Sequence, residues 1–210
     1  ASLEDFRAII DVHLVGTFLV SRAAAAHWTS VAESGTHVDA RLVNTTSTAG
    51  LWGMPGAVAY CAAKGGILSL SQCLTAELAR YGVRVNCVGP GAGTRMNTRR
   101  DGDENDHRAL PLRSAFPDAD ACAPLIVWLM SHDSAHVTGR TFENIGGSVW
   151  FLDGWRRKVR VAPDPTCALP VLFTRYRDAV AAAPEPEGAL GAVDYTAVAD
   201  PTPGAIRPPL

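Results

Sequence analysis

Apolar residues recur at steps of three and four along several segments of the chain, which is the spacing of one face of an α-helix. Glu4 and Asp5 open the first of these segments, where the helix dipole favours negative charge. Gly82 follows the second segment as the expected helix stop, and Asp118 is placed to cap the third. We predict helices over residues 3 to about 28, 58–81, 118–130, and between 171 and 183.

Short β-prone runs lie between these helices and are bounded by turn residues. The predicted strands are 41–45, 83–88 and 139–144, and the polar stretches 29–40 and 95–117 are predicted loops. Alternating strands and helices predict parallel units in an open, doubly wound α/β sheet with helices on its faces. About three strands are visible, which is few for a sheet of this kind.

The charge balance of the chain bears on its partners. The chain has 19 basic and 21 acidic residues and a formal net charge of -2, so we expect neither nucleic acid nor a membrane as a partner. On inspection, no apolar stretch reaches the length that spans a bilayer, and the first residues lack a signal-peptide layout. We therefore expect a cytoplasmic protein.

Cysteine usage points away from disulfides and metal. Five cysteines occur at positions 61, 73, 87, 122 and 167, and no two form a CxxC pair. A disulfide framework or a structural zinc site is not expected from this spacing, and buried free thiols are the favoured interpretation. We predict no metal site.

The candidate chemistry lies between Ser47 and Lys64. Tyr60 and Lys64 are four residues apart on a predicted helix, so their side chains share one face. An ammonium near a phenol favours the phenolate, and such a tyrosine exchanges a proton with an alcohol or a carbonyl near neutral pH. Ser47 follows a predicted strand at the edge where open α/β sheets bind ligands, which places its hydroxyl to hold a substrate oxygen. The bland alternative is that Tyr60 and Lys64 form an ordinary solvated pair.

Three motifs in order add weight to the catalytic interpretation. With Ser47 thirteen residues before Tyr60, they resemble the short-chain dehydrogenase/reductase family over about residues 3–147. The resemblance implies a Rossmann-like fold and hydride transfer between NAD or NADP and a small-molecule secondary alcohol or ketone. The motifs are Leu42-Val43-Asn44-Thr45-Thr46-Ser47-Thr48-Ala49-Gly50, Tyr60-Cys61-Ala62-Ala63-Lys64-Gly65-Gly66 and Val83-Arg84-Val85-Asn86-Cys87-Val88-Gly89-Pro90-Gly91.

The resemblance also implies roles for individual residues. Tyr60 would be the acid–base group, and Lys64 would favour its phenolate and bind the hydroxyls of the nicotinamide ribose. Ser47 would orient the substrate carbonyl. Family members commonly form dimers or tetramers, which implies a homo-oligomer through the two long helices. The residues that would line the nicotinamide and pyrophosphate are Pro90, Gly91 and Thr94.

Two features depart from the family pattern. His13 stands where the first helix usually has Asn, so it either holds a water linked to Lys64 as a catalytic residue or only packs the helix. No opening strand with a Gly-rich turn is present, and the glycines of 89–93 follow the wrong strand. NAD and NADP are therefore not distinguished, because the deciding residue follows a strand that the sequence does not contain.

These departures shape the expected domain organisation. We expect a fragment of a longer protein in which residues 1–150 form a partial Rossmann-like catalytic domain without the Gly-rich units. Residues 151–183 are an expected extension with a helix, and 184–210 an expected disordered tail rich in Pro and Ala. We expect this stretch alone to bind cofactor poorly.

One subgroup of the family matches further residues. Residues 137–143, Trp150 and the basic, aromatic run 154–158 resemble dehydrogenases similar to the (R)-3-hydroxyacyl-CoA dehydrogenase unit of peroxisomal multifunctional enzymes, which also have His at the position of His13. This resemblance implies a 3-hydroxyacyl thioester substrate, with 154–158 either meeting an acyl-CoA phosphate or forming a basic surface turn. The open alternatives are a non-catalytic binding or regulatory subunit, an inactive fragment, and an isomerase- or dehydratase-like use of the fold.

Overall fold

The computed structural model describes residues 2–93, 119–152, 160–161 and 168–182. These residues belong to two compact units, one that includes the chain up to Leu152 and another, Asp153–Glu187, that contains α6 (Leu169–Ala181). α6 confirms the helix predicted between residues 171 and 183. The predicted loop 95–117, the run 154–158 and the tail 184–210 lie outside the described residues.

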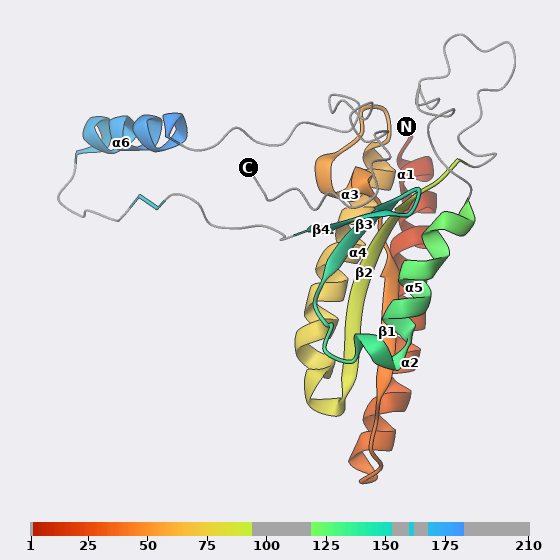
Figure 1. Ribbon diagram of the computed structural model, residues 1–210. Helices are drawn as coiled ribbons and strands as arrows, with labels where there is room; N and C mark the ends of the chain where they lie inside the picture. Colours follow the sequence, from red (N-terminus) through yellow and green to blue (C-terminus); the bar gives the residue numbers. More distant parts are fainter. Residues whose placement is uncertain (1, 94–118, 153–159, 162–167, 183–210) are drawn as a thin grey trace, which may run out of the picture. The chain divides into compact units, whose positions relative to one another are not determined.

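The first unit is built on a four-stranded sheet in the order β1-β2-β3-β4 (Figure 1). β1 (Ala40–Thr45), β2 (Val83–Gly91) and β3 (Thr141–Ile145) are parallel, which confirms the three predicted strands and the α/β fold class. β4 (Ser148–Leu152) pairs antiparallel with β3 and is not predicted from the sequence. Gly146 and Gly147 have φ angles of 56° and 89°, so they form the two-residue turn of this hairpin.

The chain opens with one helical stretch in three parts. These are α1 (Leu3–Ile10), the π-helical turn η1 (Asp11–Val15) and α2 (Gly16–Glu33). The stretch ends at Glu33 rather than near residue 28, so the predicted loop begins later than expected. The last turn is helical because Val31 and Ala32 pack against a buried apolar cluster, and this packing outweighs the polar local sequence.

The stretch Leu3–Glu33 is also long and apolar enough, by length and composition, to cross a membrane. This corrects the sequence-based judgement that no such stretch exists. A single helix of this kind is weak evidence, because the core helix of a soluble protein and a signal sequence meet the same criterion. In the structure α2 contacts the sheet, where the hydroxyl of buried Ser21 lies 3.5 Å from Asn44 Oδ1 of β1.

The remaining helices of this unit follow the predicted pattern with shifted ends. α4 (Val58–Leu78) continues as a 3-10 turn to Tyr81, and Gly82 ends it with a φ of 76°, as the stop at Gly82 predicts. α5 (Ala123–Met130) begins later than predicted, after a 3-10 turn over Ala119–Cys122. The predicted cap Asp118 lies outside the described residues.

Apolar clusters on both faces of the sheet attach these helices. Alternate residues of a strand point to opposite faces. Val83 and Val85 of β2 belong to a buried cluster against which side chains of α2 and α4 pack. Val88 belongs to a second cluster with Leu129 of α5. The result is the helix–sheet–helix layering of a doubly wound α/β fold.

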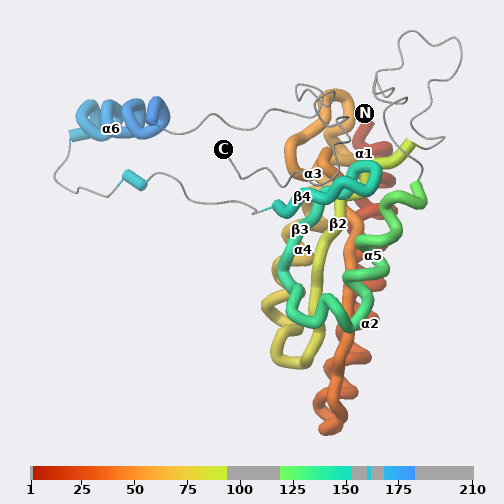
Figure 2. The backbone as a smooth tube through the Cα atoms, in the orientation of Figure 1, coloured from red at the N-terminus to blue at the C-terminus, as the bar shows by residue number. Residues whose placement is uncertain are grey.

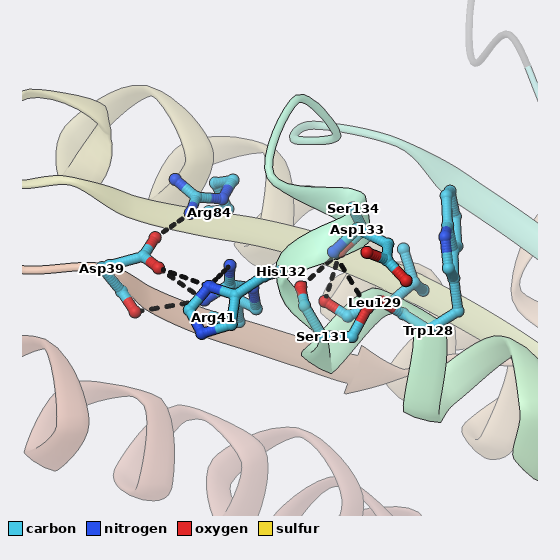
Figure 3. A network of polar contacts seen from close by, with 9 residues as sticks. All are labelled: Asp39, Arg41, Arg84, Trp128, Leu129, Ser131, His132, Asp133 and Ser134. Atoms are coloured by element: carbon cyan, nitrogen blue, oxygen red, sulfur yellow. Dashed lines mark hydrogen bonds and ion pairs between the residues drawn. The ribbon is translucent and has the colours of Figure 1, made fainter.

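A polar network joins the starts of β1 and β2 to the turn that follows α5 (Figure 3). Asp39 forms ion pairs with Arg41 and Arg84, which are register partners on the two strands. The Nδ1 atom of His132 lies 3.2 Å from Asp39 Oδ2. Because the Arg41 side chain is only 7% exposed, Asp39 compensates a charge that is largely removed from water.

Candidate active site

Three parts of the chain meet around the first turns of α4. The stretch α1-η1 and the short helix α3 (Thr48–Trp52) both contact α4, near the end of the sheet where β1 and β2 finish (Figure 2). Glycines permit this close approach. A Cβ atom on Gly66 would lie 2.8 Å from Leu14 Cδ2, and one on Gly50 would lie 2.6 Å from the backbone nitrogen of Gly65. The predicted catalytic residues lie on or beside these elements.

Lys64 is a buried cation on α4, one helical turn after Tyr60. Its Nζ atom donates a hydrogen bond to the carbonyl oxygen of Thr45 at 3.0 Å and lies 5.7 Å from the centroid of the Tyr60 ring. Burial lowers the pKa of Lys64 because it disfavours the charged form, and the nearby Cys87 thiol opposes this effect. The pair is therefore held in place by the fold and is not the solvated pair of the bland interpretation.

His13 lies at the centre of the π-helical turn η1 and faces Tyr60. The two ring centroids are 5.3 Å apart and the ring planes meet at 81°, which is an edge-to-face contact. Burial lowers the pKa of His13, and the positive charge of Lys64 lowers it further. The structure thus brings His13, Tyr60 and Lys64 together, and π-helical turns of this kind are frequent at functional sites.

Ser47 caps the N-terminus of α3, directly after β1. Its Oγ atom accepts a hydrogen bond from the backbone nitrogen of Ala49 at 3.2 Å, which leaves its own proton available to a substrate oxygen. α3 is pressed onto α4 at Gly50, beside the backbone of Lys64. The fold therefore holds Ser47 at the same end of the sheet as Lys64.

The predicted cofactor-binding residues lie at the end of β2 as far as they are described. Pro90 is exposed, and the carbonyl of Gly91 accepts a hydrogen bond from Gly146 at 3.0 Å. Both follow Val88, the register partner of Thr45, so they lie at the edge of the sheet that carries Ser47. Thr94 lies outside the described residues.

A buried polar network behind Lys64 is not predicted from the sequence. Asn44 Nδ2 donates to the hydroxyl of Ser71 at 3.0 Å, and Ser71 also bonds the Cys87 thiol. Asn44 and Cys87 are register partners on β1 and β2, and the hydroxyl of Thr46 donates to the Lys64 carbonyl at 2.8 Å. Only the strand register brings these groups together, so no local sequence signal reveals them.

The part of the chain that the structure describes contains no group of three or more His, Cys, Asp or Glu side chains that could hold a metal ion. The titratable groups gathered at the site are instead a lysine, a tyrosine and a histidine. This set suits proton transfer.

Comparisons with known proteins agree with the fold and with this set of residues. Residues 1–148 match the family model described as enoyl-(acyl carrier protein) reductase. The chain belongs to the short-chain dehydrogenase/reductase family. This confirms the resemblance carried by the three motifs.

The similar proteins include hydroxyacyl-CoA dehydrogenases. One from Mycobacterium tuberculosis is 35% identical over 193 residues, which are 91% of this chain and 60% of that protein. A (3R)-3-hydroxyacyl-CoA dehydrogenase of Rattus norvegicus is 34% identical over 149 residues, 70% of this chain and 55% of that protein. The crystal structure of a short chain dehydrogenase from Mycobacterium avium has 36% identity and a TM-score of 0.77, and the match covers 91% of this chain and 62% of that one. This chain thus spans less than two thirds of the length of each.

Proposed function

We propose that this chain is the catalytic part of an NAD(P)-dependent oxidoreductase that interconverts a secondary alcohol and a ketone. The observation that supports this most is the buried ammonium of Lys64 one helical turn from Tyr60, at the sheet edge that carries Ser47. A buried cation beside a phenol is costly to maintain, which argues for a functional rather than a structural pair.

Lys64 has the hydrogen-bonding capacity to hold a nicotinamide ribose. An ammonium carries three N–H donors, and among the described residues only Thr45 accepts one. Two donors therefore remain for the ribose hydroxyls. Pro90 and Gly91 lie at the strand ends where open α/β sheets bind nucleotides, and Thr94 belongs to the same proposal. Relatives of known structure contain NADH.

The side chains divide the chemistry as follows. Bound NAD(P) would supply the acceptor or donor of hydride. In the oxidation direction, Tyr60 takes the hydroxyl proton of the alcohol while Ser47 donates a hydrogen bond to the same oxygen. In the reduction direction Tyr60 returns the proton to the carbonyl oxygen. Lys64 holds a positive charge beside the phenol throughout.

The substrate class that we propose is a 3-hydroxyacyl thioester. Both the mycobacterial and the rat relative are named hydroxyacyl-CoA dehydrogenases, and the match to the first covers 91% of this chain. The basic run 154–158 lies outside the described residues, so its contact with an acyl-CoA phosphate stays a prediction.

We further propose a cytoplasmic homo-oligomer that forms through α2 and α4. Phe18, Leu19 and Val20 of α2 are 44%, 49% and 69% exposed, and Val58 of α4 is 71% exposed. Soluble monomers seldom expose many large apolar side chains together. Sedimentation velocity should show a dimer or tetramer, and a monomer at micromolar concentration would contradict the proposal.

The function is tested with enzyme expressed from its complete coding sequence. We expect NAD(P)-dependent oxidation of a 3-hydroxyacyl-CoA, and Tyr60→Phe should lower kcat by at least about 10²-fold because the acid–base group is lost. Tyr81→Phe is the matched control, since Tyr81 bonds Arg80 at the far end of α4. Unchanged turnover in Tyr60→Phe would remove Tyr60 from the mechanism. Cofactor binding without turnover of any hydroxyacyl thioester would favour a non-catalytic member of the family.

A further inference from the structure

His13 brings a third acid–base side chain into contact with the Tyr60–Lys64 pair. Its ring lies edge-to-face against the Tyr60 ring at 5.3 Å between centroids, and Lys64 Nζ is 5.7 Å from the same Tyr60 centroid. The contact is imposed by the fold. The π-helical turn η1 presents His13, and the next residue, Leu14, is pressed onto α4 at Gly66.

The two ring nitrogens of His13 are available for proton exchange. Within the described part of the chain, the polar contact made by this residue is through its backbone carbonyl, which accepts the Thr17 hydroxyl at 2.7 Å. The imidazole is half-buried and so reaches solvent, whereas Lys64 is 8% exposed and its Nζ atom is engaged with Thr45. His13 therefore lies between a buried pair and water.

We propose that His13 is the group through which Tyr60 and Lys64 exchange the reaction proton with solvent. This inference rests on the proposed oxidoreductase function. When the alcohol is oxidised, its O–H bond breaks and the proton goes to the Tyr60 phenolate. The C–H bond breaks with its electron pair, which leaves as hydride to NAD(P)⁺, and the C=O bond forms. The proton then moves from Tyr60 to one ring nitrogen of His13, directly or through one water, and a proton leaves to solvent from the other.

The electrostatics of the site suit this role. A neutral imidazole accepts a proton at one nitrogen and donates at the other. Burial and the Lys64 charge lower the pKa of His13, so the ring is neutral and able to accept a proton at neutral pH. Of the elements packed against η1, α4 supplies Lys64 and Tyr60, and no charged group of α1 or α2 among the described residues contributes to this shift.

Three substitutions of His13 separate proton exchange from packing. His13→Ala removes the ring and opens space, His13→Asn keeps an amide that cannot titrate, and His13→Phe keeps the aromatic contact with Tyr60. We expect kcat of His13→Ala to fall by roughly 10²-fold with little change in KM, and imidazole added to the buffer to restore most of it. The Asn and Phe variants should be slow and should not respond to imidazole. Wild-type kcat in His13→Ala or His13→Phe, or a loss that imidazole does not restore in His13→Ala, would overturn the inference.

A readout independent of turnover completes the test. The ring of His13, assigned by comparison with His13→Asn, is titrated by NMR in the wild-type protein and in Lys64→Met. We expect the pKa of His13 to rise in Lys64→Met because a neighbouring positive charge is removed. An unchanged pKa would overturn the coupling between His13 and Lys64 even in an inactive protein. Absence of dehydrogenase activity in the wild type would refute the proposed function, whereas an active enzyme without imidazole rescue would refute only the role of His13.

Discussion

The ammonium nitrogen of Lys64 donates a hydrogen bond to the backbone carbonyl of Thr45 at 3.0 Å. In return, the hydroxyl of Thr46 donates to the Lys64 carbonyl at 2.8 Å. These two bonds tie the first half of α4 to the end of β1. They also hold the lysine where only 8% of it is exposed, so its charge is stabilised by a few fixed partners rather than by water.

The burial of Lys64 predicts a pH dependence of stability. Because folding lowers its pKa below the ordinary value of 10.5, the unfolded chain binds more protons between the folded-state pKa and 10.5. The cost of burying the charge is therefore complete at neutral pH and disappears as the pH rises to 10.5. We expect the free energy of unfolding of the wild type, relative to Lys64→Met, to increase over this range. Urea denaturation at several pH values measures it, and a difference that stays constant or falls would contradict the prediction.

Gly50 is predicted to be intolerant of a side chain. A Cβ atom there would lie 2.6 Å from the Lys64 carbonyl carbon and 2.6 Å from the Gly65 nitrogen, so α3 must move away from α4. Gly50→Ala should lower the free energy of unfolding by about 1–3 kcal/mol and reduce activity, because Ser47 moves with α3.

Gly16→Ala is the matched control for this substitution. Gly16 has helical angles, and the nearest atom to an added Cβ is 3.8 Å away. The control should be neutral or stabilise the protein by about 0.5–1 kcal/mol, since alanine loses less backbone entropy in a helix. Thermal or urea unfolding compares the two variants. If both have the same stability, the close packing at Gly50 is not limiting.

The network around Asp39 predicts a second effect on stability, at the opposite end of the strands (Figure 3). Asp39→Asn removes the negative charge that pairs with Arg41 and Arg84 and leaves the largely buried Arg41 without compensation. We expect a loss of about 1–3 kcal/mol in unfolding free energy. His132→Ala should have little effect, because that side chain is 89% exposed and exposed ion pairs contribute little. Equal effects of the two substitutions would argue against this account.

Cys87 is predicted to be chemically inert in the folded protein. Burial raises the pKa of its thiol to about 11, so little thiolate forms at neutral pH and reagents have no access. Cys73 is exposed on α4 and serves as the internal reference. Iodoacetamide followed by peptide mass spectrometry should label Cys73 in the folded state and Cys87 only after unfolding. Equal labelling rates in the folded state would show that the interior near Lys64 opens readily.

Local spacing predicted much of the site. Tyr60 and Lys64 share a face because both lie on one helix, four residues apart, and that relationship needs no knowledge of the fold. Ser47 was placed at the end of a strand by the β-prone run that precedes it, and β1 ends two residues earlier at Thr45. Local patterns failed at element ends. The helix ends at Glu33 because its last turn packs on a cluster around Val38, and that contact is not encoded in the spacing of the turn itself.

Contacts between distant segments explain the rest. The edge-to-face contact of His13 with Tyr60 joins two helices, and the bond from Lys64 to Thr45 joins a helix to a strand. The pairing of Arg41 with Arg84 around Asp39 depends on the register of β1 and β2. No periodicity encodes such pairs, because each depends on how two separately formed elements pack.

The sequence by itself determined the family, the parallel α/β arrangement and the order of Ser47, Tyr60 and Lys64, since these follow from hydrophobic period and from short-range spacing along one chain. Only the tertiary structure decided that Lys64 is buried against a strand carbonyl and that the ring of His13 touches Tyr60. The physical reason is that burial and electrostatic coupling depend on distances through space, and packing sets those distances.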